Sequence, residues 1–516
     1  MTWQPEVDEI ERRRAIAREM GGEEAVARHH ERGELTLRER LDGLLDDGSY
    51  REYGVLSGST EYSEEGELTG FTPSNAIVAI GKLGGRDIVV GGEDATIRGG
   101  ASDGGGSAKT YGLDSLAMQY RIPLVRLHES GGGSVRTNRS SHSGRAMTVG
   151  KGGPSPYVDM LGSVPVVAAA MGSTAGIAAA RMALAHFSVM VKDAAVVFAG
   201  GPPVVERALG QSLTKWELGG WKVHAYSGLV DNVAEDEADC FAQIRRFLSY
   251  LPNNAWELPL RAKPTDDPVR RDEELLSVIP RDRRRTYDPK KLIDHVFDRE
   301  SFFELTPYFG RALTTGLARL DGYAVGVVSS NPNWIGGAMD GDASDKMVRF
   351  VDLCDSFHLP IVSFEDDPGY MIGLEAESSG TLRRGIRAMA AVKQATVPWI
   401  NFIVRKAYGV AADAHHNGNG PTYAWPSGEW GSIPLEGGVA AAHRREIEAA
   451  EDPNRRRQEL EDLYAKDRNP FLRAESFGLY DLIDPRETRP IVTDWVNRAQ
   501  TALKTELGPK PRLMRP

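Results

Sequence analysis

Two short turns of small residues carry the chemistry that this sequence could perform. Gly176-Ile177 follows the apolar run 164–170, and Gly409-Val410-Ala411 follows the apolar run 397–404. Where a helix begins directly after a buried strand, its first backbone N–H groups lack a helical partner and can bind one carbonyl oxygen. We therefore predict two oxyanion holes as the catalytic centres, one formed by Gly176 and Ile177 and the other by Val410 and Ala411.

The second half of the chain repeats motifs of the first half in the same order, about 235 to 250 residues later. A single turn of this kind is explained better by close helix packing, but its recurrence favours two related sites. We predict an internal duplication whose halves share an active site. The matching segments are Leu41-Asp42 and Ile293-Asp294, Lys82-Leu83-Gly84-Gly85 and Arg319-Leu320-Asp321-Gly322, Ile122-Pro123 and Leu359-Pro360, and Gly176-Ile177-Ala178-Ala179 and Gly409-Val410-Ala411-Ala412.

Length and composition fit two α/β domains. A chain of 516 residues is too long for a single core, so we expect one domain over 1–260, including a helical N-terminal extension, and a second over 261–516. Short β-rich runs alternate with alanine-rich helical stretches between about 75 and 240, as in α/β folds. The uncharged run 164–180 contains Pro165 and reads as a buried strand leading into a helix, not as a membrane span.

Charge and cysteine content narrow the class of protein. The formal net charge of −11 and a pI near 5.6 argue against a general nucleic-acid binder, although a local basic pocket for an anion remains possible. Cys240 and Cys354 are the only cysteines, so no disulfide framework or zinc ribbon is expected. The charged N-terminus lacks the apolar core of a signal peptide. We expect a cytoplasmic protein without a membrane anchor.

Several longer motifs between about His30 and Arg445 resemble one family, the carboxyltransferase (beta) subunits of biotin-dependent acyl-CoA carboxylases, including the propionyl-CoA carboxylase beta type. The likeness covers most of the chain, and the motifs together are highly specific. They are Gly33-Glu34-Leu35-Thr36, Arg38-Glu39-Arg40, Glu129-Ser130-Gly131-Gly132, Glu217-Leu218-Gly219-Gly220, Asp342-Ala343-Ser344-Asp345-Lys346, Pro368-Gly369-Tyr370, Ala395-Thr396-Val397-Pro398, Arg405-Lys406-Ala407-Tyr408-Gly409 and Ala424-Trp425-Pro426.

The resemblance implies two tandem crotonase-like domains and a ring-shaped hexamer, with each active site between the first domain of one protomer and the second domain of another. It implies transfer of a carboxyl group from carboxybiotin, held by a separate carrier protein, to the α-carbon of an acyl-CoA. A biotinyl-lysine motif and an ATP-binding carboxylase segment are absent from the sequence. Biotin carboxylase and biotin carrier protein are therefore expected as partners, in separate chains or one fused subunit.

The resemblance also implies roles for individual residues. Gly131, Gly132, Gly172, Gly369 and Gly409 are expected to line the binding sites for coenzyme A and biotin. Asp413 falls where the family tunes acyl-chain choice, and a carboxylate there is similar to the propionyl-CoA type; alternatively, Asp413 caps the following segment.

Several departures from the family pattern keep other functions open. The first turn usually reads Gly-Gly where this chain has Gly176-Ile177, and β-branched side chains in both turns crowd the pocket. Glu365-Asp366-Asp367 replaces an apolar run, and 133–138 differs from the family sequence. The alternatives are a decarboxylase of a carboxyacyl-CoA, with or without biotin, and a non-catalytic paralogue in a mixed ring.

Three weaker signals do not support other chemistry. The glycine-rich stretch 100–110 has Ala108 where a P-loop needs glycine before its lysine, so we expect no ATP site there. His415 and His416 are adjacent and lack the spacing of a helical metal site. Ser130 has no Gly-x-Ser-x-Gly elbow around it, so a serine hydrolase is not predicted.

Overall fold

The computed structural model describes residues 2–101, 104–133 and 156–515, and within them the backbone forms two compact units. The first unit runs from the N-terminal helix to Ser249 and includes Asn253–Ala255. The second comprises Tyr250–Pro252 and Trp256–Arg515. Within the described residues, no helix is both long enough and apolar enough to cross a membrane.

The first unit is built on a mixed sheet of eight strands in the order β1-β4-β5-β6-β7-β8-β10, with β9 paired to the end of β7. The first two pairings are antiparallel, and those from β5 to β10 are parallel. The strands are β1 (Arg51–Tyr53), β4 (Ala76–Leu83), β5 (Arg86–Glu93), β6 (Leu124–Ser130), β7 (Val166–Ala175), β8 (Phe187–Val191), β9 (Val196–Phe198) and β10 (Asn232–Ala234).

The second unit repeats this sheet strand for strand, in the order β11-β12-β13-β14-β15-β16-β18 with β17 paired to the end of β15. The identical order, including the strand off the main path, confirms the internal duplication. The strands are β11 (Phe303–Leu305), β12 (Leu313–Leu320), β13 (Tyr323–Ser330), β14 (Ile361–Asp367), β15 (Trp399–Tyr408), β16 (Thr422–Ala424), β17 (Glu429–Gly431) and β18 (Asp481–Leu482).

An aspartate that binds two N–H groups of a turn between strands is found at the same place in both units. The carboxylate of Asp46 accepts the N–H groups of Gly84 and Gly85 in the β4–β5 turn, at 2.9 and 2.8 Å. Asp298 accepts the N–H groups of Asp321 and Gly322 in the β12–β13 turn, at 3.1 and 2.9 Å. Each carboxylate satisfies donors that a tight turn leaves unpaired. The similarity of the sequence motifs around both turns therefore reflects one shared hydrogen-bonding requirement.

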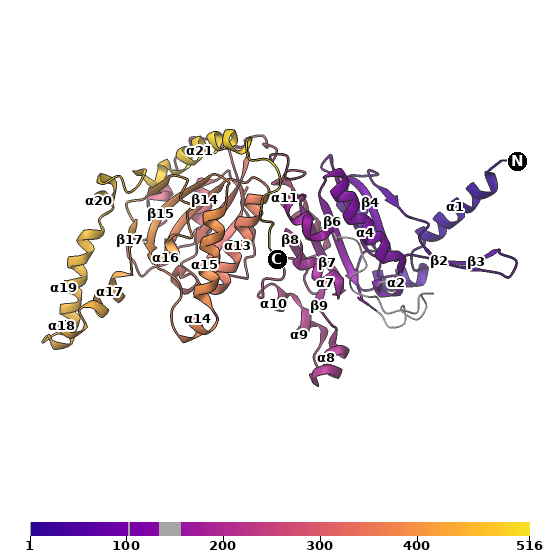
Figure 1. The fold of residues 1–516 in the computed structure, drawn as a ribbon, viewed down its shortest axis with the longest axis horizontal. Coiled ribbons are helices and arrows are strands. Elements are labelled where there is room, and N and C mark those ends of the chain that lie inside the picture. The colour runs from indigo at the N-terminus through magenta and orange to yellow at the C-terminus, as the bar shows by residue number, and fades with distance from the viewer. Residues whose placement is uncertain (1, 102–103, 134–155, 516) are drawn as a thin grey trace. The chain divides into compact units, whose positions relative to one another are not determined.

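Helices cover the sheets of both units in corresponding places (Figure 1). In the first unit α4 packs on β4 and β5, and α11 packs on β7, β8 and β10. In the second unit α13 packs on β12 and lies beside α15. The helices of these layers are α3 (Leu37–Leu44), α4 (Gly104–Tyr120), α7 (Ile177–Ala183), α11 (Glu237–Ser249), α12 (Pro289–Val296), α13 (Gly341–Ser356), α15 (Thr381–Gln394), α16 (Gly409–Ala412) and α21 (Thr488–Leu503).

Other helices extend each unit beyond its sheet. The first unit carries helices and a hairpin near its N-terminus, and both units have helices between their last strands (Figure 1). These elements are α1 (Gln4–Arg18), α2 (Glu23–His30), β2 (Gly58–Tyr62), β3 (Leu68–Pro73), α6 (Pro156–Asp159), α8 (Pro202–Leu209), α9 (Lys215–Gly219), α10 (Trp221–His224), α14 (Leu374–Ser378), α17 (Leu435–Ala442), α18 (Arg444–Ala449), α19 (Pro453–Ala465) and α20 (Pro470–Glu475).

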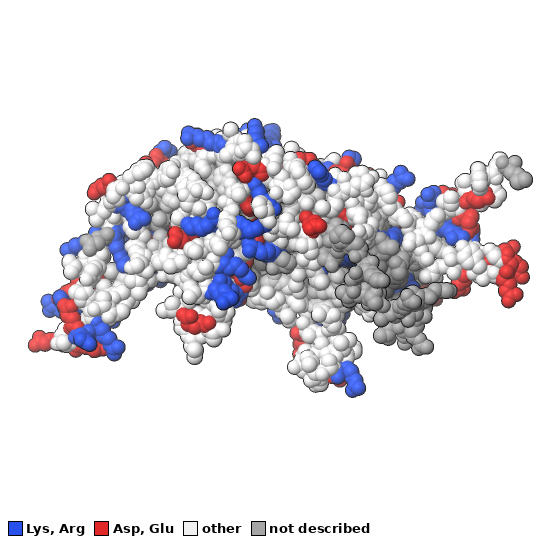
Figure 2. Space-filling view, viewed as in Figure 1, with Lys and Arg blue, Asp and Glu red and all other residues white. Residues whose placement is uncertain are grey.

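Ion pairs tie α13 to α15 at the surface of the second unit. The space-filling view shows basic side chains gathered over these helices (Figure 2). Arg384 reaches Asp342 at 2.6 Å and Asp345 at 2.5 Å, and Arg387 also pairs with Asp345. Because these side chains are partly exposed, solvent and salt screen the pairs, which contribute little stability. The buried apolar contacts between the two helices carry the packing.

Aromatic stacking organises the centre of the second unit. The rings of Phe364 and Phe402 stack with centroids 5.7 Å apart, and Tyr423 continues the stack at 5.5 Å from Phe402. Phe297 meets Phe364 edge-on at 6.1 Å. These contacts fix β14, β15 and β16 relative to α12, because offset and edge-on pairs of aromatic rings are favourable. The ends of β14 and β15, which lead to the candidate site, are thereby held rigidly.

Candidate active site

The first predicted turn lies where β7 ends and α7 begins. Gly176 has φ 65°, a left-handed conformation that favours glycine, and the helix starts at Ile177. The N–H of Gly176 donates to the carbonyl of Phe198 in β9 at 3.3 Å. That donor is therefore engaged within the protein, and the structure does not support Gly176 as half of an oxyanion hole. The first helical residues, Ile177 and Ala178, have N–H groups without a helical acceptor.

The second predicted turn has the same geometry. Gly409 follows β15 with φ 63°, and it opens the short helix α16. Val410 and Ala411 therefore occupy the first helical turn, where N–H groups have no acceptor within the helix. In the duplicated structure Ile177 and Ala178 correspond to Val410 and Ala411. The exposed fractions agree, since the side chain of Ile177 is 50% exposed and that of Val410 is 51% exposed.

Glycines from a neighbouring loop approach the first turn. Gly131 and Gly132 follow β6, and a Cβ on Gly132 would lie 3.2 Å from the Cβ of Ala175. A Cβ on Gly176 would lie 3.8 Å from the Cα of Gly132. The structure thus brings Gly132 close to Gly176, and Gly131 precedes Gly132 in the chain. The segment 133–138 differs from the family sequence, and residues 134–138 lie outside the described residues.

Gly172 has a packing role in this structure. It is buried within β7, and a Cβ there would lie 2.6 Å from the carboxylate carbon of Glu129. The close approach explains why glycine is required without invoking a ligand. Gly172 is therefore not brought into the group formed by the loop glycines, although it lies on the strand that leads to the turn.

The second site has its own loop glycine. Gly369 follows β14 with φ 122°, and a Cβ there would lie 4.0 Å from the carbonyl of Tyr408, directly before Gly409. The N–H of Gly369 donates to Asp367 at 2.7 Å. Gly369 therefore lies near Tyr408, the residue that precedes the second turn.

Asp413 directly follows α16 and its carboxylate is half exposed. Lys393 Nζ lies 3.7 Å and His416 Nε2 lies 3.5 Å from its Oδ1. No capping hydrogen bond from this side chain is present among the described residues, so the structure gives no support to a capping role. Asp413 therefore lies directly after the second turn, and its role in the choice of acyl chain stays a prediction.

The unusual acidic run at the end of β14 is buried. Glu365, Asp366 and Asp367 are each at most 1% exposed. Asp366 pairs with Arg405 at 2.8 Å, and Asp367 accepts a hydrogen bond from His415 Nε2 at 3.2 Å. The run therefore belongs to an internal network and does not line an altered substrate pocket.

The same network perturbs protonation. Burial raises the pKa of Glu365 to about 7, because its charged form has lost water. Burial also raises the pKa of Asp367. For His415, burial favours the neutral form, but the hydrogen bond to Asp367 and the charges of Glu365 and Asp367 raise its pKa above the usual value. Asp367 thus links the Gly369 loop to the segment that follows α16.

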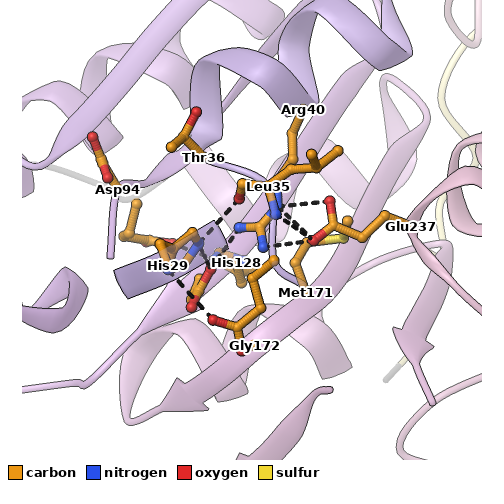
Figure 3. A network of polar contacts seen from close by, with 12 residues as sticks. His29, Leu35, Thr36, Arg40, Asp94, His128, Met171, Gly172 and Glu237 are labelled. Atoms are coloured by element: carbon orange, nitrogen blue, oxygen red, sulfur yellow. Dashed lines mark hydrogen bonds and ion pairs between the residues drawn. The ribbon is translucent and has the colours of Figure 1, made fainter. Parts of the chain in front are cut away.

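A second buried network underlies the first site (Figure 3). Arg40, on α3, binds Glu129 at 2.6 Å and Glu237 at 2.8 Å, and it is 1% exposed. Glu129 lies on β6, two residues before Gly131. In the sequence, Arg40 and Glu129 belong to two separate motifs, Arg38-Glu39-Arg40 and Glu129-Ser130-Gly131-Gly132. Their opposite charges were the only sign of a contact between them, and their distance apart in the sequence did not predict it.

Three residues of this network have potential ligand atoms close enough together to hold one metal ion. His29, Glu34 and Glu129 have ligand atoms within 4.8 Å of one another. However, Arg40 already binds Glu129, and Arg32 binds Glu34 at 2.8 Å. Because two guanidinium groups neutralise these carboxylates, we assign no metal to the group.

Comparison with known proteins decides the family. Residues 28–508 match the model of the carboxyl transferase domain. The chain belongs to the carboxyl transferase family. It is 35% identical to the propionyl-CoA carboxylase carboxyltransferase subunit of Haloferax mediterranei over 95% of both chains. It is 33% identical to the methylmalonyl-CoA decarboxylase subunit alpha of Veillonella parvula, also over 95% of both.

A solved carboxyl transferase has the same fold. The crystal structure of transcarboxylase 12S, described as a hexamer assembly with methylmalonyl-coenzyme A and methylmalonic acid bound, superposes with a TM-score of 0.87. The two proteins are 31% identical, and the match covers 99% of this chain and 97% of the other. The predicted class is confirmed: this chain is an acyl-CoA carboxyltransferase with two crotonase-like domains.

Proposed function

We propose that this carboxyl transferase moves a carboxyl group from biotin on a separate carrier protein to the α-carbon of a short- or medium-chain acyl-CoA, with propionyl-CoA as the most favoured type. A biotin carboxylase, separate from or fused to the carrier, would load the biotin. The similarity to the propionyl-CoA carboxylase subunit supports this substrate class. Cys240 and Cys354 are both free, which is compatible with a cytoplasmic setting.

The observation that carries this proposal is the pair of equivalent turns. Removing the α-proton of a thioester builds negative charge on its carbonyl oxygen, and the biotin urea oxygen gains charge as the carboxyl group leaves. Two acceptors therefore need two sets of donors. The N–H groups of Val410 and Ala411 form one set, and those of Ile177 and Ala178 form the other. When bound, biotin supplies the carboxyl group and a urea nitrogen that can take up the α-proton.

The glycines beside the turns fit this role. Without side chains at Gly132 and Gly369, a carbonyl group can approach the backbone donors closely. The sites are proposed to form between the first domain of one protomer and the second domain of another, in a hexamer like that described for transcarboxylase 12S. Asp413 would then select the acyl chain from the second domain.

Carboxylation by the purified chain, reconstituted with a loaded biotin carrier protein, tests the proposal. Acetyl-CoA, propionyl-CoA, butyryl-CoA and octanoyl-CoA are compared, and propionyl-CoA is expected to give the highest kcat/KM. Ala411→Pro deletes a donor N–H and should lower kcat about a hundredfold or more. Ala411→Gly keeps the N–H and serves as the matched control. Equal rates for the two variants, or no carboxylation of any acyl-CoA, would overturn the proposal.

A second candidate function is decarboxylation of a carboxyacyl-CoA. The methylmalonyl-CoA decarboxylase relative favours it, as do the β-branched side chains of Ile177 and Val410 in the turns. The same N–H groups would stabilise the enolate left when the carboxyl group departs. Release of carbon dioxide from methylmalonyl-CoA without any biotin would support this function and exclude strict transfer.

A further inference from the structure

The second unit contains a cavity of about 540 Å³ that the proposed reaction does not use. It lies among the segment 275–283, the loop 425–429 and the segment 465–470. A volume of this size suits a small organic molecule. None of the residues of the second turn lines the cavity.

Four arginines line the cavity, together with a single described carboxylate, that of Glu429. Arg283 is paired with Glu429 at 2.7 Å, and Arg405 is paired with the buried Asp366 at 2.8 Å. The charges of these two arginines are therefore balanced within the protein. The other two are Arg281 and Arg468.

Arg468 has only neutral partners among the described residues. Its guanidinium donates to the hydroxyl of Tyr408 at 2.7 Å and to the carbonyl of Ile433 at 2.9 Å. It also lies over the ring of Tyr408, 5.0 Å from the centroid. These contacts orient the planar guanidinium, and no carboxylate among the described side chains balances its charge. Arg281 is exposed and has no ion pair with any described side chain.

Apolar side chains also line the cavity. Leu275, Leu276 and Ile279 come from the segment before the second sheet, and Leu435 and Pro426 complete this lining. A cavity lined both by aliphatic side chains and by two arginines that have no ion pair with a described side chain suits an amphiphilic anion. Arginine binds phosphate and carboxylate groups through paired hydrogen bonds.

We propose that this cavity, the arginine pocket, binds a small organic anion in which a phosphate or carboxylate group is joined to an apolar body. Arg468 and Arg281 hold the anionic group, and the leucines contact the apolar part. The arginine pocket is separate from the turns that carry out carboxyl transfer. Tyr408 connects the two, because its hydroxyl binds Arg468 and its backbone leads into Gly409.

Calorimetric titration of the full chain with octyl phosphate, octanoate and inorganic phosphate tests the proposal. Octyl phosphate or octanoate should bind at least tenfold more tightly than inorganic phosphate, and whichever binds better identifies the anionic group. Arg468→Gln and Arg281→Gln should each weaken binding at least fivefold. Arg444→Gln is the matched control, since Arg444 is an exposed arginine outside the arginine pocket and should leave binding unchanged.

Three results would overturn the proposal: no binding of either amphiphile at millimolar concentration, equal binding by the Arg281→Gln, Arg468→Gln and Arg444→Gln variants, or no preference for the amphiphiles over inorganic phosphate. Arg281→Gln guards against misfolding, because this side chain is exposed and its replacement disturbs no described contact. The titration needs no turnover. Failure of carboxyl transfer would therefore leave the result interpretable.

Discussion

At the scale of single residues, the backbone N–H groups of the two turns carry the proposed chemistry. The sequence located both turns from small residues after apolar runs, and it named Ile177, Val410 and Ala411 among the donors. It also named Gly176, whose N–H is engaged by Phe198 in the structure. That contact depends on how β9 pairs with the end of β7, and no local pattern around Gly176 predicts a partner more than twenty residues away.

Ile177→Pro tests the first turn with little structural cost. Ile177 is the first residue of α7, where proline is well tolerated and only the N–H is lost. We expect kcat for carboxyl transfer to fall about a hundredfold or more while the thermal midpoint changes little. Ile177→Ala keeps the N–H and should stay within a few-fold of wild type. If Ile177→Pro retained full turnover, this N–H would have no catalytic role.

Glu365 makes stability depend on pH. Its pKa rises from 4.5 to about 7 on folding, so the native state holds a proton that the unfolded state releases. The free energy of unfolding must therefore decrease as pH rises from about 5 to 8, and the raised pKa of His415 acts in the same direction. Glu365→Gln removes the Glu365 contribution.

From pH 5 to pH 8, the free energy of unfolding of wild type should fall by about 2 kcal/mol more than that of Glu365→Gln. Denaturant unfolding of both proteins at the two pH values measures this difference. Parallel pH dependence of the two proteins would show that Glu365 does not hold a proton in the folded state.

At the scale of elements, the strands and helices could be predicted from the sequence, whereas the buried ion-pair networks could not. The run 164–180 predicts a strand leading into a helix, and the structure confirms this with β7 and α7. The alternation of β-rich runs with helical stretches and the residues typical of turns are local patterns, so a single sequence is enough to detect them. The meeting of Arg40, Glu129 and Glu237 depends on tertiary packing between α3, β6 and α11. It could not be read from spacing.

Arg40→Met should destabilise the first unit strongly. The substitution leaves the carboxylates of Glu129 and Glu237 without their buried counter-charge, at a cost of about 3 kcal/mol. Arg14→Met, at an exposed site on α1, is the control and should cost less than about 0.5 kcal/mol. Thermal and denaturant unfolding measure both variants. Equal stability of the two would mean that the Arg40 network contributes nothing to the fold.

At the scale of the whole molecule, duplication explains why one chain carries two turns. Two copies of the same sheet place equivalent N–H groups at the end of β7 and at the end of β15. The sequence showed this repeat because the turn motifs themselves are shared. The pairing of domains between protomers comes from the family resemblance and stays a prediction.

Mixing two inactive variants tests that pairing. If a site uses the first domain of one protomer and the second domain of another, a mixed pair of Ile177→Pro and Ala411→Pro protomers contains one site with both turns intact. Co-expression should then restore up to about a quarter of wild-type activity, assuming random pairing. Sites contained within one protomer would give no recovery. Each variant alone, and both in one chain, provide the controls.

The most direct test of the central claim is transfer from methylmalonyl-CoA to free biotin by the purified chain. If the two turns serve two carbonyl groups, propionyl-CoA should form only when biotin is present, and in the same amount as carboxylated biotin. Ala411→Pro should abolish the reaction, whereas Ala411→Gly should retain it. Formation of propionyl-CoA at the same rate without biotin, or equal rates for the two variants, would contradict the account.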